Sequence, residues 1–179
     1  MTNIFSQLYT SPIGLMQIGA TDNSLLYIEY DDSPNCQKKV QSVVTALSAT
    51  IHNEPSAYHQ EIISQLNEYF AGKRKEFSLQ LQTNGTEFQR SVWQSLQTIP
   101  YGTTTTYKEQ SLAMNNPLAI RAIASTNAKN CINIVIPCHR VVGTNGSLTG
   151  YSGGIWRKRW LLDFERQHTP STQQQISLL

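Results

Sequence analysis

The sequence predicts an α/β protein of two small domains, a sheet-and-helix part followed by a helical part. Extended apolar runs dominate the first part, whereas apolar residues at helical spacing dominate the second. The charge changes as well. Residues 1–82 carry five Lys or Arg and eight Asp or Glu, a balance of −3, and residues 83–179 carry nine and four, a balance of +5. We therefore expect domains at 1–82 and 83–168, a polar tail at 169–179, and an anionic partner for the second domain.

The composition excludes several classes of protein. The chain has 179 residues, enough to bury a core, and only 15% of them are charged, which is typical of globular proteins. Three cysteines without a secretory signal argue against a disulfide framework, and their spacing does not suit a metal site. No apolar run approaches the roughly 20 residues of a membrane helix. We expect a cytoplasmic protein with no metal and no cofactor.

Alternating apolar residues predict three strands near the N-terminus. The segment IFSQLYTSPIGLMQIGA supplies two extended runs around a turn at residues 11–14, and SLLYIEY supplies the third. Residues 58–71 have apolar side chains at helical spacing, with Gly72 as a stop. The other elements expected here are a helix at 36–50, a strand at 76–82 (EFSLQLQ) and a linker at 83–86 (TNGT).

The second part is richer in helices. Thr86 is expected to cap a helix that ends before Pro100-Tyr101-Gly102, and Phe88, Val92, Leu96 and Ile99 form its apolar stripe. A short helix at 107–114, an NNP break and a helix from Pro117 to Asn127 make a helix-turn-helix pattern. A last helix at 155–167 should carry Ile155, Trp160, Leu161 and Phe164 inward.

The second helix of this pattern has an unusual composition. Leu118, Ala122 and Ile123 can face the core, which leaves Arg121 among small residues on the other side: Ala124, Ser125 and Ala128. Such a face lets another backbone approach closely, and in a helix-turn-helix protein that backbone is nucleic acid. An ordinary packing face of small residues explains the same pattern.

The segment IVIPCHRVVG places Cys138, His139 and Arg140 side by side behind Pro137. A thiolate is the reactive form of cysteine, and a nearby base or cation favours it. Neighbours on an extended segment point to opposite sides, so His139 should reach the sulfur through a water or a bend at Pro137. A buried structural thiol remains the alternative.

Glu165 is a candidate to orient the imidazole. It lies near the C-terminal end of the last helix, where the helix dipole disfavours a carboxylate, so a specific partner could account for it. The alternative is a solvated side chain beside Arg157 or Arg166.

These motifs resemble the O6-alkylguanine-DNA alkyltransferase (methylated-DNA–protein-cysteine methyltransferase) family, over about residues 1–168. The similar segments are the SPIG turn, GTEFQRSVWQSLQTIPYGTTTTY at 85–107, AIRAIASTNAKN at 119–130, IPCHRVVG at 136–143 and GYSGGIWRKRWLLDFE at 150–165. The resemblance implies a ribonuclease-H-like α/β N-terminal domain and a C-terminal winged helix-turn-helix domain.

The family's chemistry is irreversible and happens once per molecule. By resemblance, Cys138 accepts the alkyl group from O6 of guanine in DNA, with O4 of thymine as a further candidate substrate. His139 activates the thiol through a water, Glu165 holds the imidazole, and Asn130 orders the turn ahead of the cysteine. The partner implied is double-stranded DNA containing O6-alkylguanine. We expect a monomer with no membrane contact.

The resemblance also assigns the contacts with DNA and with the flipped base. Tyr107 crowds a phosphate and donates to guanine, and Arg121 fills the vacated place in the base stack from the minor groove. The rest of the expected DNA-facing surface consists of Ala119, Ala124 and Ser125. The expected alkylguanine pocket consists of Tyr107, Val141, Tyr151, Ser152 and Gly153.

Three positions depart from the family pattern: Cys131 replaces a common proline, Ala124 a glycine and Thr106 a serine. Other functions fit less well. Non-catalytic relatives lack the cysteine that is present here, the adaptive-response regulators add a cysteine-rich metal-binding domain, and a cysteine hydrolase needs an oxyanion site.

Overall fold

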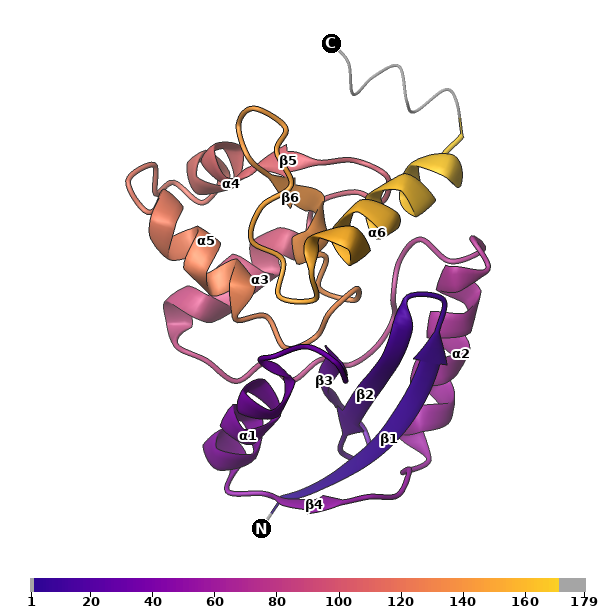
Figure 1. The fold of residues 1–179 in the computed structure, drawn as a ribbon. Coiled ribbons are helices and arrows are strands. Elements are labelled where there is room, and N and C mark those ends of the chain that lie inside the picture. Colours follow the sequence, from indigo (N-terminus) through magenta and orange to yellow (C-terminus); the bar gives the residue numbers. More distant parts are fainter. Residues whose placement is uncertain (1, 171–179) are drawn as a thin grey trace. The chain divides into compact units, whose positions relative to one another are not determined.

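The computed structural model describes residues 2–170, which form two compact units (Figure 1). One unit contains the residues up to Arg90 together with Cys131–Val135, and the other contains Ser91–Asn130 and the residues from Ile136 onward. The chain therefore crosses between the units three times, after residues 90, 130 and 135. Most of the expected tail lies outside the described residues.

The first unit is built on a four-stranded sheet of order β3-β2-β1-β4. Strands β1 (Asn3–Ser11), β2 (Gly14–Ala20) and β3 (Leu25–Tyr30) form an antiparallel meander, and β4 (Thr50–His52) pairs parallel with β1. The turn after β1 is the expected one. Gly14 adopts a φ of 113°, which favours glycine, and its carbonyl accepts a hydrogen bond from the Ser11 hydroxyl.

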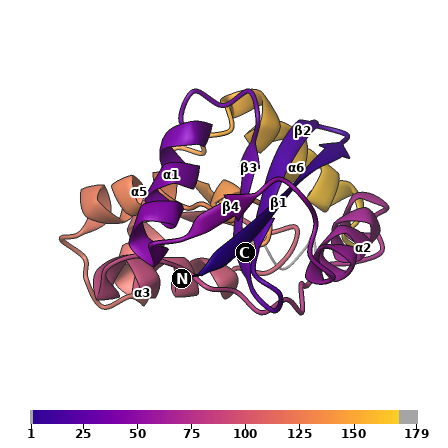
Figure 2. The ribbon, with the colours of Figure 1, turned by 90° about the horizontal axis from the view of Figure 1, so that it is seen from below.

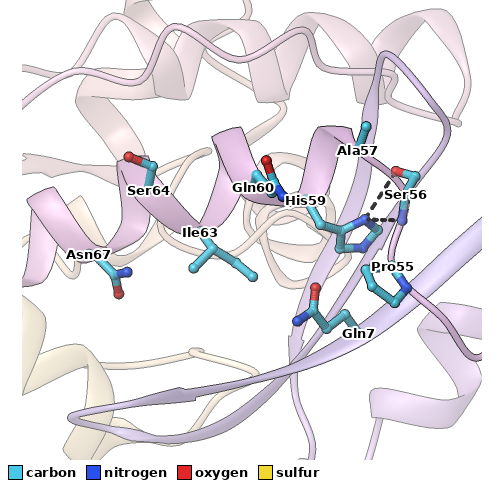
Figure 3. Close-up of a pocket in the computed structure, with 9 residues that line it drawn as sticks. All are labelled: Gln7, Pro55, Ser56, Ala57, His59, Gln60, Ile63, Ser64 and Asn67. Carbon is cyan, nitrogen blue, oxygen red and sulfur yellow. Dashed lines mark hydrogen bonds between the residues drawn. The ribbon is translucent and has the colours of Figure 1, made fainter.

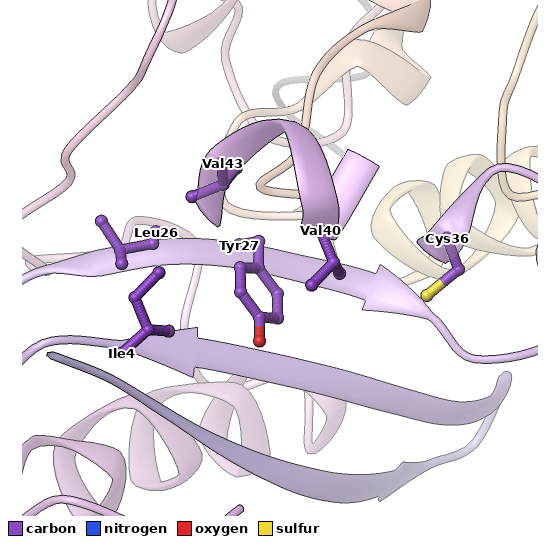
Figure 4. Close-up of a cluster of buried hydrophobic side chains, with 6 residues drawn as sticks. All are labelled: Ile4, Leu26, Tyr27, Cys36, Val40 and Val43. Atoms are coloured by element: carbon purple, nitrogen blue, oxygen red, sulfur yellow. The ribbon is translucent and has the colours of Figure 1, made fainter. Parts of the chain in front are cut away.

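Two helices pack on this sheet (Figure 2). Helix α1 (Cys36–Leu47) contacts β3, and α2 (Tyr58–Phe70) contacts β1 and β2. Figure 4 shows Val40 and Val43 of α1 pointing toward Leu26 and Tyr27 of β3, with Ile4 of β1 completing the cluster. Every residue of β3 is buried, which agrees with its mostly apolar sequence; the exception, Glu29, pairs with Lys39 of α1.

Two expectations for this unit are wrong. Residues 76–82 do not form a strand, because only Leu81 makes a bridge, to Leu25, and the remainder has no ladder. The helix expected at 36–50 ends earlier, and Thr50 belongs to β4. That helix ends at Leu47 because Ser48 adopts a left-handed conformation with a φ of 46°. The stop expected at Gly72, with a φ of 72°, is confirmed.

The expected succession of short helices follows, beginning at the end of the first unit and continuing through the second. Helix α3 (Glu87–Gln97) begins after Thr86, whose hydroxyl accepts from the Gln89 amide as the expected cap. Then follow β5 (Thr105–Thr106), α4 (Tyr107–Ala113), α5 (Ile120–Ala128), a 3₁₀ turn (Cys138–Arg140), β6 (Val141–Val142) and α6 (Ile155–Gln167). Strands β5 and β6 pair in parallel.

Helix α5 differs from the expectation in its start and its orientation. It begins at Ile120 rather than at Pro117, and Leu118 is 96% exposed instead of facing the core. Ala122 is also exposed. The buried face consists of Ile123, Thr126 and Asn127, because the polar side chains find internal partners: Thr126 donates to the Ala122 carbonyl and Asn127 to Gln110.

Helix α6 also differs in part. Ile155 is 39% exposed, whereas Leu161 is buried as expected. The helix ends at Gln167, and just beyond it Thr169 is buried and donates to the Glu165 carbonyl. Across residues 2–170, no helix combines the length and apolarity needed to cross a membrane.

Candidate active site

Cys138 begins the 3₁₀ turn and is 7% exposed. Its backbone amide donates to the Ile136 carbonyl at 2.9 Å. The buried Asn130 side chain donates to the same carbonyl at 2.9 Å and to the Cys138 sulfur at 3.3 Å. Asn130 therefore fixes the backbone ahead of the cysteine and contacts the sulfur itself.

His139 and Glu165 meet inside the second unit. The Nε2 atom of His139 lies 2.8 Å from Oε1 of Glu165, and both side chains are fully buried. Burial lowers the pKa of His139 because it disfavours the imidazolium, although Glu165 opposes this effect. A neutral imidazole that donates from Nε2 leaves Nδ1 as an acceptor. Nδ1 is buried and has no hydrogen-bond partner within the described part of the chain.

Glu165 is not a solvated side chain. Oε2 accepts from Arg140 Nε at 2.9 Å and from the Gly102 amide at 3.0 Å, and Oε1 accepts from Arg140 Nη2 at 3.0 Å. Burial alone would raise the pKa of Glu165, but His139 and Arg140 outweigh it and hold the pKa well below its usual range. Arg166, the alternative partner, pairs instead with Asp163 at 3.4 Å.

Arg140 is a buried member of this cluster, not a phosphate-facing cation. Besides its two contacts with Glu165, it donates from Nη1 to the Ile99 carbonyl at 2.6 Å, and its guanidinium lies 5.6 Å from the Tyr101 ring. The expectation of an extended Cys-His-Arg segment is wrong. The 3₁₀ turn, instead of strict alternation, brings both His139 and Arg140 to the same carboxylate.

Sequence reasoning missed Lys158. This residue is 1% exposed, and Nζ donates to the Val141 carbonyl at 2.6 Å and to the Thr149 carbonyl at 2.8 Å. Burial lowers the pKa of Lys158 to about 8, and the charge of the Cys138 thiolate opposes this shift. Positions 158, 161, 162 and 165 lie on one face of α6, but the sequence alone does not distinguish a buried lysine on that face from a solvated one.

Two of the expected pocket residues, Tyr107 and Val141, contact this lysine. Tyr107 donates from its hydroxyl to the Thr149 carbonyl at 3.2 Å, and its ring lies 5.8 Å from Lys158 Nζ. Tyr151 and Gly153 are buried, and Ser152 is half-buried. Lys158 thus lies next to both Tyr107 and Val141. Its ammonium and the Tyr107 hydroxyl both donate to the Thr149 carbonyl, which holds the start of the Gly-rich segment in place.

The expected DNA-facing residues lie on α5 and just before it. Arg121 and Ser125 are exposed, and Ala119 and Ala124 are half-buried. Trp93 anchors the opposite side of the helix by donating from Nε1 to the Thr126 carbonyl at 3.0 Å. Arg121 is therefore exposed on a helix whose buried side is held in place by Trp93.

The other two thiols differ from Cys138 in their surroundings. Burial and nearby carboxylates raise the pKa of Cys36 to about 11, and burial raises that of Cys131 to about 12. Both therefore stay protonated at neutral pH. No group of three or more His, Cys, Asp or Glu within residues 2–170 is arranged to hold a metal ion.

A groove of about 630 Å³ in the first unit is a second place to look for chemistry (Figure 3). Its one titratable side chain, His59, accepts from the Ser56 amide at Nδ1, and its Nε2 lies 3.3 Å from the Ile18 carbonyl. Burial lowers the pKa of His59. With both ring nitrogens engaged in the fold, His59 has no acceptor left for catalysis.

Comparison with known proteins identifies the family. Residues 87–167 match the model of the 6-O-methylguanine DNA methyltransferase DNA binding domain, and residues 4–83 match that of its ribonuclease-like domain. The chain belongs to the 6-O-methylguanine DNA methyltransferase family. Both the family and the two-part α/β layout expected from the sequence are confirmed, and the two methyltransferase models meet near the linker expected at 83–86.

Individual relatives of this methyltransferase family cover nearly the whole chain. A methylated-DNA–protein-cysteine methyltransferase of Mycolicibacterium paratuberculosis is 42% identical, over 90% of this chain and 92% of its own. One of Methanosarcina acetivorans is 38% identical, over 90% and 98%. A crystal structure of Mycobacterium tuberculosis OGT in complex with DNA has a TM-score of 0.78 and 36% identity, covering 94% of this chain and 96% of that one.

Proposed function

We propose that the chain repairs double-stranded DNA by direct reversal, as a methylated-DNA–protein-cysteine methyltransferase that acts once. The Cys138 sulfur attacks the alkyl carbon on O6 of guanine, a sulfur–carbon bond forms, and the oxygen–carbon bond breaks. The products are S-alkylcysteine and unmodified guanine. The names of the relatives and the DNA complex of one of them support the substrate.

The observation that carries the proposal is the buried Nδ1 of His139, which has no hydrogen-bond partner among residues 2–170. With Nε2 committed to Glu165, this nitrogen is the atom that can take the Cys138 proton, through a water. The proton then passes to the departing guanine. Asn130 stabilises the thiolate by donating to the sulfur. The raised pKa values of Cys36 and Cys131 keep these two thiols out of the reaction.

The base must come to the sulfur, because Cys138 is largely buried and cannot reach a stacked guanine. Arg121, exposed on α5, fills the vacated position from the minor groove, and Ala119, Ala124 and Ser125 allow close contact. Tyr107, Val141, Tyr151, Ser152 and Gly153 form the pocket for the flipped base. We place the reaction in the cytoplasm, with a monomeric protein.

Intact-mass analysis tests this function. The protein is mixed with a short duplex that carries one O6-methylguanine, and a parallel sample carries O4-methylthymine. We expect one methyl adduct, located on Cys138, and repair that stops at one lesion per protein molecule. Repeated turnover, or equal repair by Cys138→Ala, would show that the mechanism is wrong.

A further inference from the structure

The Glu165 carboxylate is shared between a base and a cation. His139 contacts Oε1 at 2.8 Å, and Arg140 contacts both oxygens, at 2.9 Å through Nε and at 3.0 Å through Nη2. This two-point contact is the strong geometry of an arginine–carboxylate pair. Because all three side chains are buried, their charges act on one another with little screening by water.

A buried carboxylate next to a histidine normally favours the imidazolium. An imidazolium has no lone pair at Nδ1, so it cannot take a proton from Cys138. Glu165 alone would therefore hold His139 in the wrong state for a base. Arg140 lowers the pKa of His139, in addition to burial and to the Lys158 ammonium, whereas Glu165 raises it. The charged groups of the cluster are Glu165 and Lys158 on α6 and Arg140 on the 3₁₀ turn, and Cys138 joins them once its proton has left.

We propose that Arg140 is a positioning residue for alkyl transfer, which pairs with Glu165 and cancels its charge so that His139 stays a neutral imidazole. Glu165 can then orient His139 through the Nε2 hydrogen bond without protonating it. The inference rests on the proposed function, because His139 is the general base of that reaction and Arg140 is proposed to keep it neutral. The described side-chain contacts of Arg140 are with Glu165, the Ile99 carbonyl and the Tyr101 ring.

A purely structural role for Arg140 makes a different prediction. Its Nη1 donates to the Ile99 carbonyl and its guanidinium lies over Tyr101, so the side chain also ties the segment after α3 to the 3₁₀ turn. Loss of these contacts alone would lower the rate by the same factor at every pH. Loss of charge cancellation would instead move the pH dependence.

The test is the single-turnover rate of methyl transfer from an O6-methylguanine duplex, measured between pH 5.5 and 8. In wild type the rate should fall on the acid side of the pH–rate profile, where His139 becomes protonated; we call this the acid limb. For Arg140→Met we expect the acid limb to shift to higher pH by about one unit or more, the range that an uncancelled neighbouring charge produces. The rate at pH 6 should fall roughly tenfold for each unit, with recovery toward pH 8. Arg140→Lys keeps the charge and should keep an acid limb near that of the wild type. Arg166→Met, which removes an exposed arginine beside Glu165, is the matched control and should change nothing.

NMR titration of the His139 ring gives the same answer without turnover. A raised pKa in Arg140→Met supports the proposal, and an unchanged pKa with a uniformly lower rate overturns it. If Arg140→Met does not fold, Glu165→Gln provides the opposite test: the pKa of His139 must fall further, and a rise overturns the proposal. A wild-type protein that takes no methyl group would refute the proposed function itself, a result distinct from either outcome.

Discussion

The Nε2 atom of His139 lies 2.8 Å from Oε1 of Glu165, and neither side chain is exposed to solvent. This one contact fixes the tautomer of the imidazole, because a neutral ring that donates from Nε2 must accept at Nδ1. The contacts of Glu165 also explain why a carboxylate is tolerated near the C-terminal end of α6, where the helix dipole disfavours it. Arg140 and the Gly102 amide donate hydrogen bonds to the carboxylate oxygens that His139 leaves available.

We expect His139→Gln to slow methyl transfer by roughly 10²- to 10⁴-fold, the usual contribution of a general base. Affinity for duplex DNA, measured by fluorescence anisotropy, should stay within about twofold, because His139 is fully buried. Single-turnover kinetics with an O6-methylguanine duplex measure the effect on rate. A rate within threefold of the wild type would remove His139 from the mechanism.

Local patterns predicted most of the elements but not the charge network. The β1–β2 hairpin, β3 and the α4–α5 pair follow from alternation, turn residues and caps, which act over a few positions. Residues 76–82 have strand composition but only one bridging position, because pairing depends on a neighbour that local sequence does not specify.

The site was predictable only where a motif was local. Cys138 and His139 stand out as neighbours, and Glu165 stands out because it opposes the helix dipole. Arg140 and Lys158 do not, because a cation with a buried partner looks the same in sequence as a solvated one. Their partners are a carboxylate 25 positions away and two main-chain carbonyls, which only the fold brings together.

Arg121→Ala should separate base flipping from chemistry. Arg121 is exposed on α5, so its loss should weaken repair of duplex DNA by tenfold or more, whereas reaction with free O6-benzylguanine should change little. Both rates are measured under single-turnover conditions. Arg159→Ala removes another exposed cation, on α6, and controls for the loss of positive charge. Equal losses on both substrates would contradict a finger role for Arg121.

Thr106→Ala should destabilise the helix that carries Tyr107. The Thr106 hydroxyl accepts from the Glu109 amide at 3.1 Å, and the Glu109 carboxylate accepts from the Thr106 amide at 2.7 Å, which makes a complete capping box. Losing this cap should lower the free energy of unfolding by about 1 kcal/mol and Tm by about 2–4 °C. Thr106→Ser keeps the hydroxyl and should match the wild type, so the departure from the family's serine is harmless. Thr104→Ala, at an exposed position, is the control in thermal and urea unfolding.

Glu29→Gln should become more stable than the wild type as pH rises. Glu29 is fully buried on β3, with Lys39 Nζ 2.9 Å from Oε1, and burial raises its pKa from 4.5 to about 7 despite the opposing effects of Lys39 and Asn133. A raised carboxyl pKa means that the folded state holds the proton longer than the unfolded state. Wild-type stability is therefore lost as pH rises from about 4.5 through 7.

The 2.5-unit difference between 4.5 and about 7 sets an upper limit of about 3 kcal/mol for that loss. Glutamine stays neutral, so the free energy of unfolding of Glu29→Gln should rise relative to the wild type between pH 5 and pH 8 in urea titrations. Glu54→Gln, an exposed change, should show no such trend. If the two proteins differ by the same amount at both pH values, Glu29 is ionised throughout, and its pairing with Lys39 outweighs its burial.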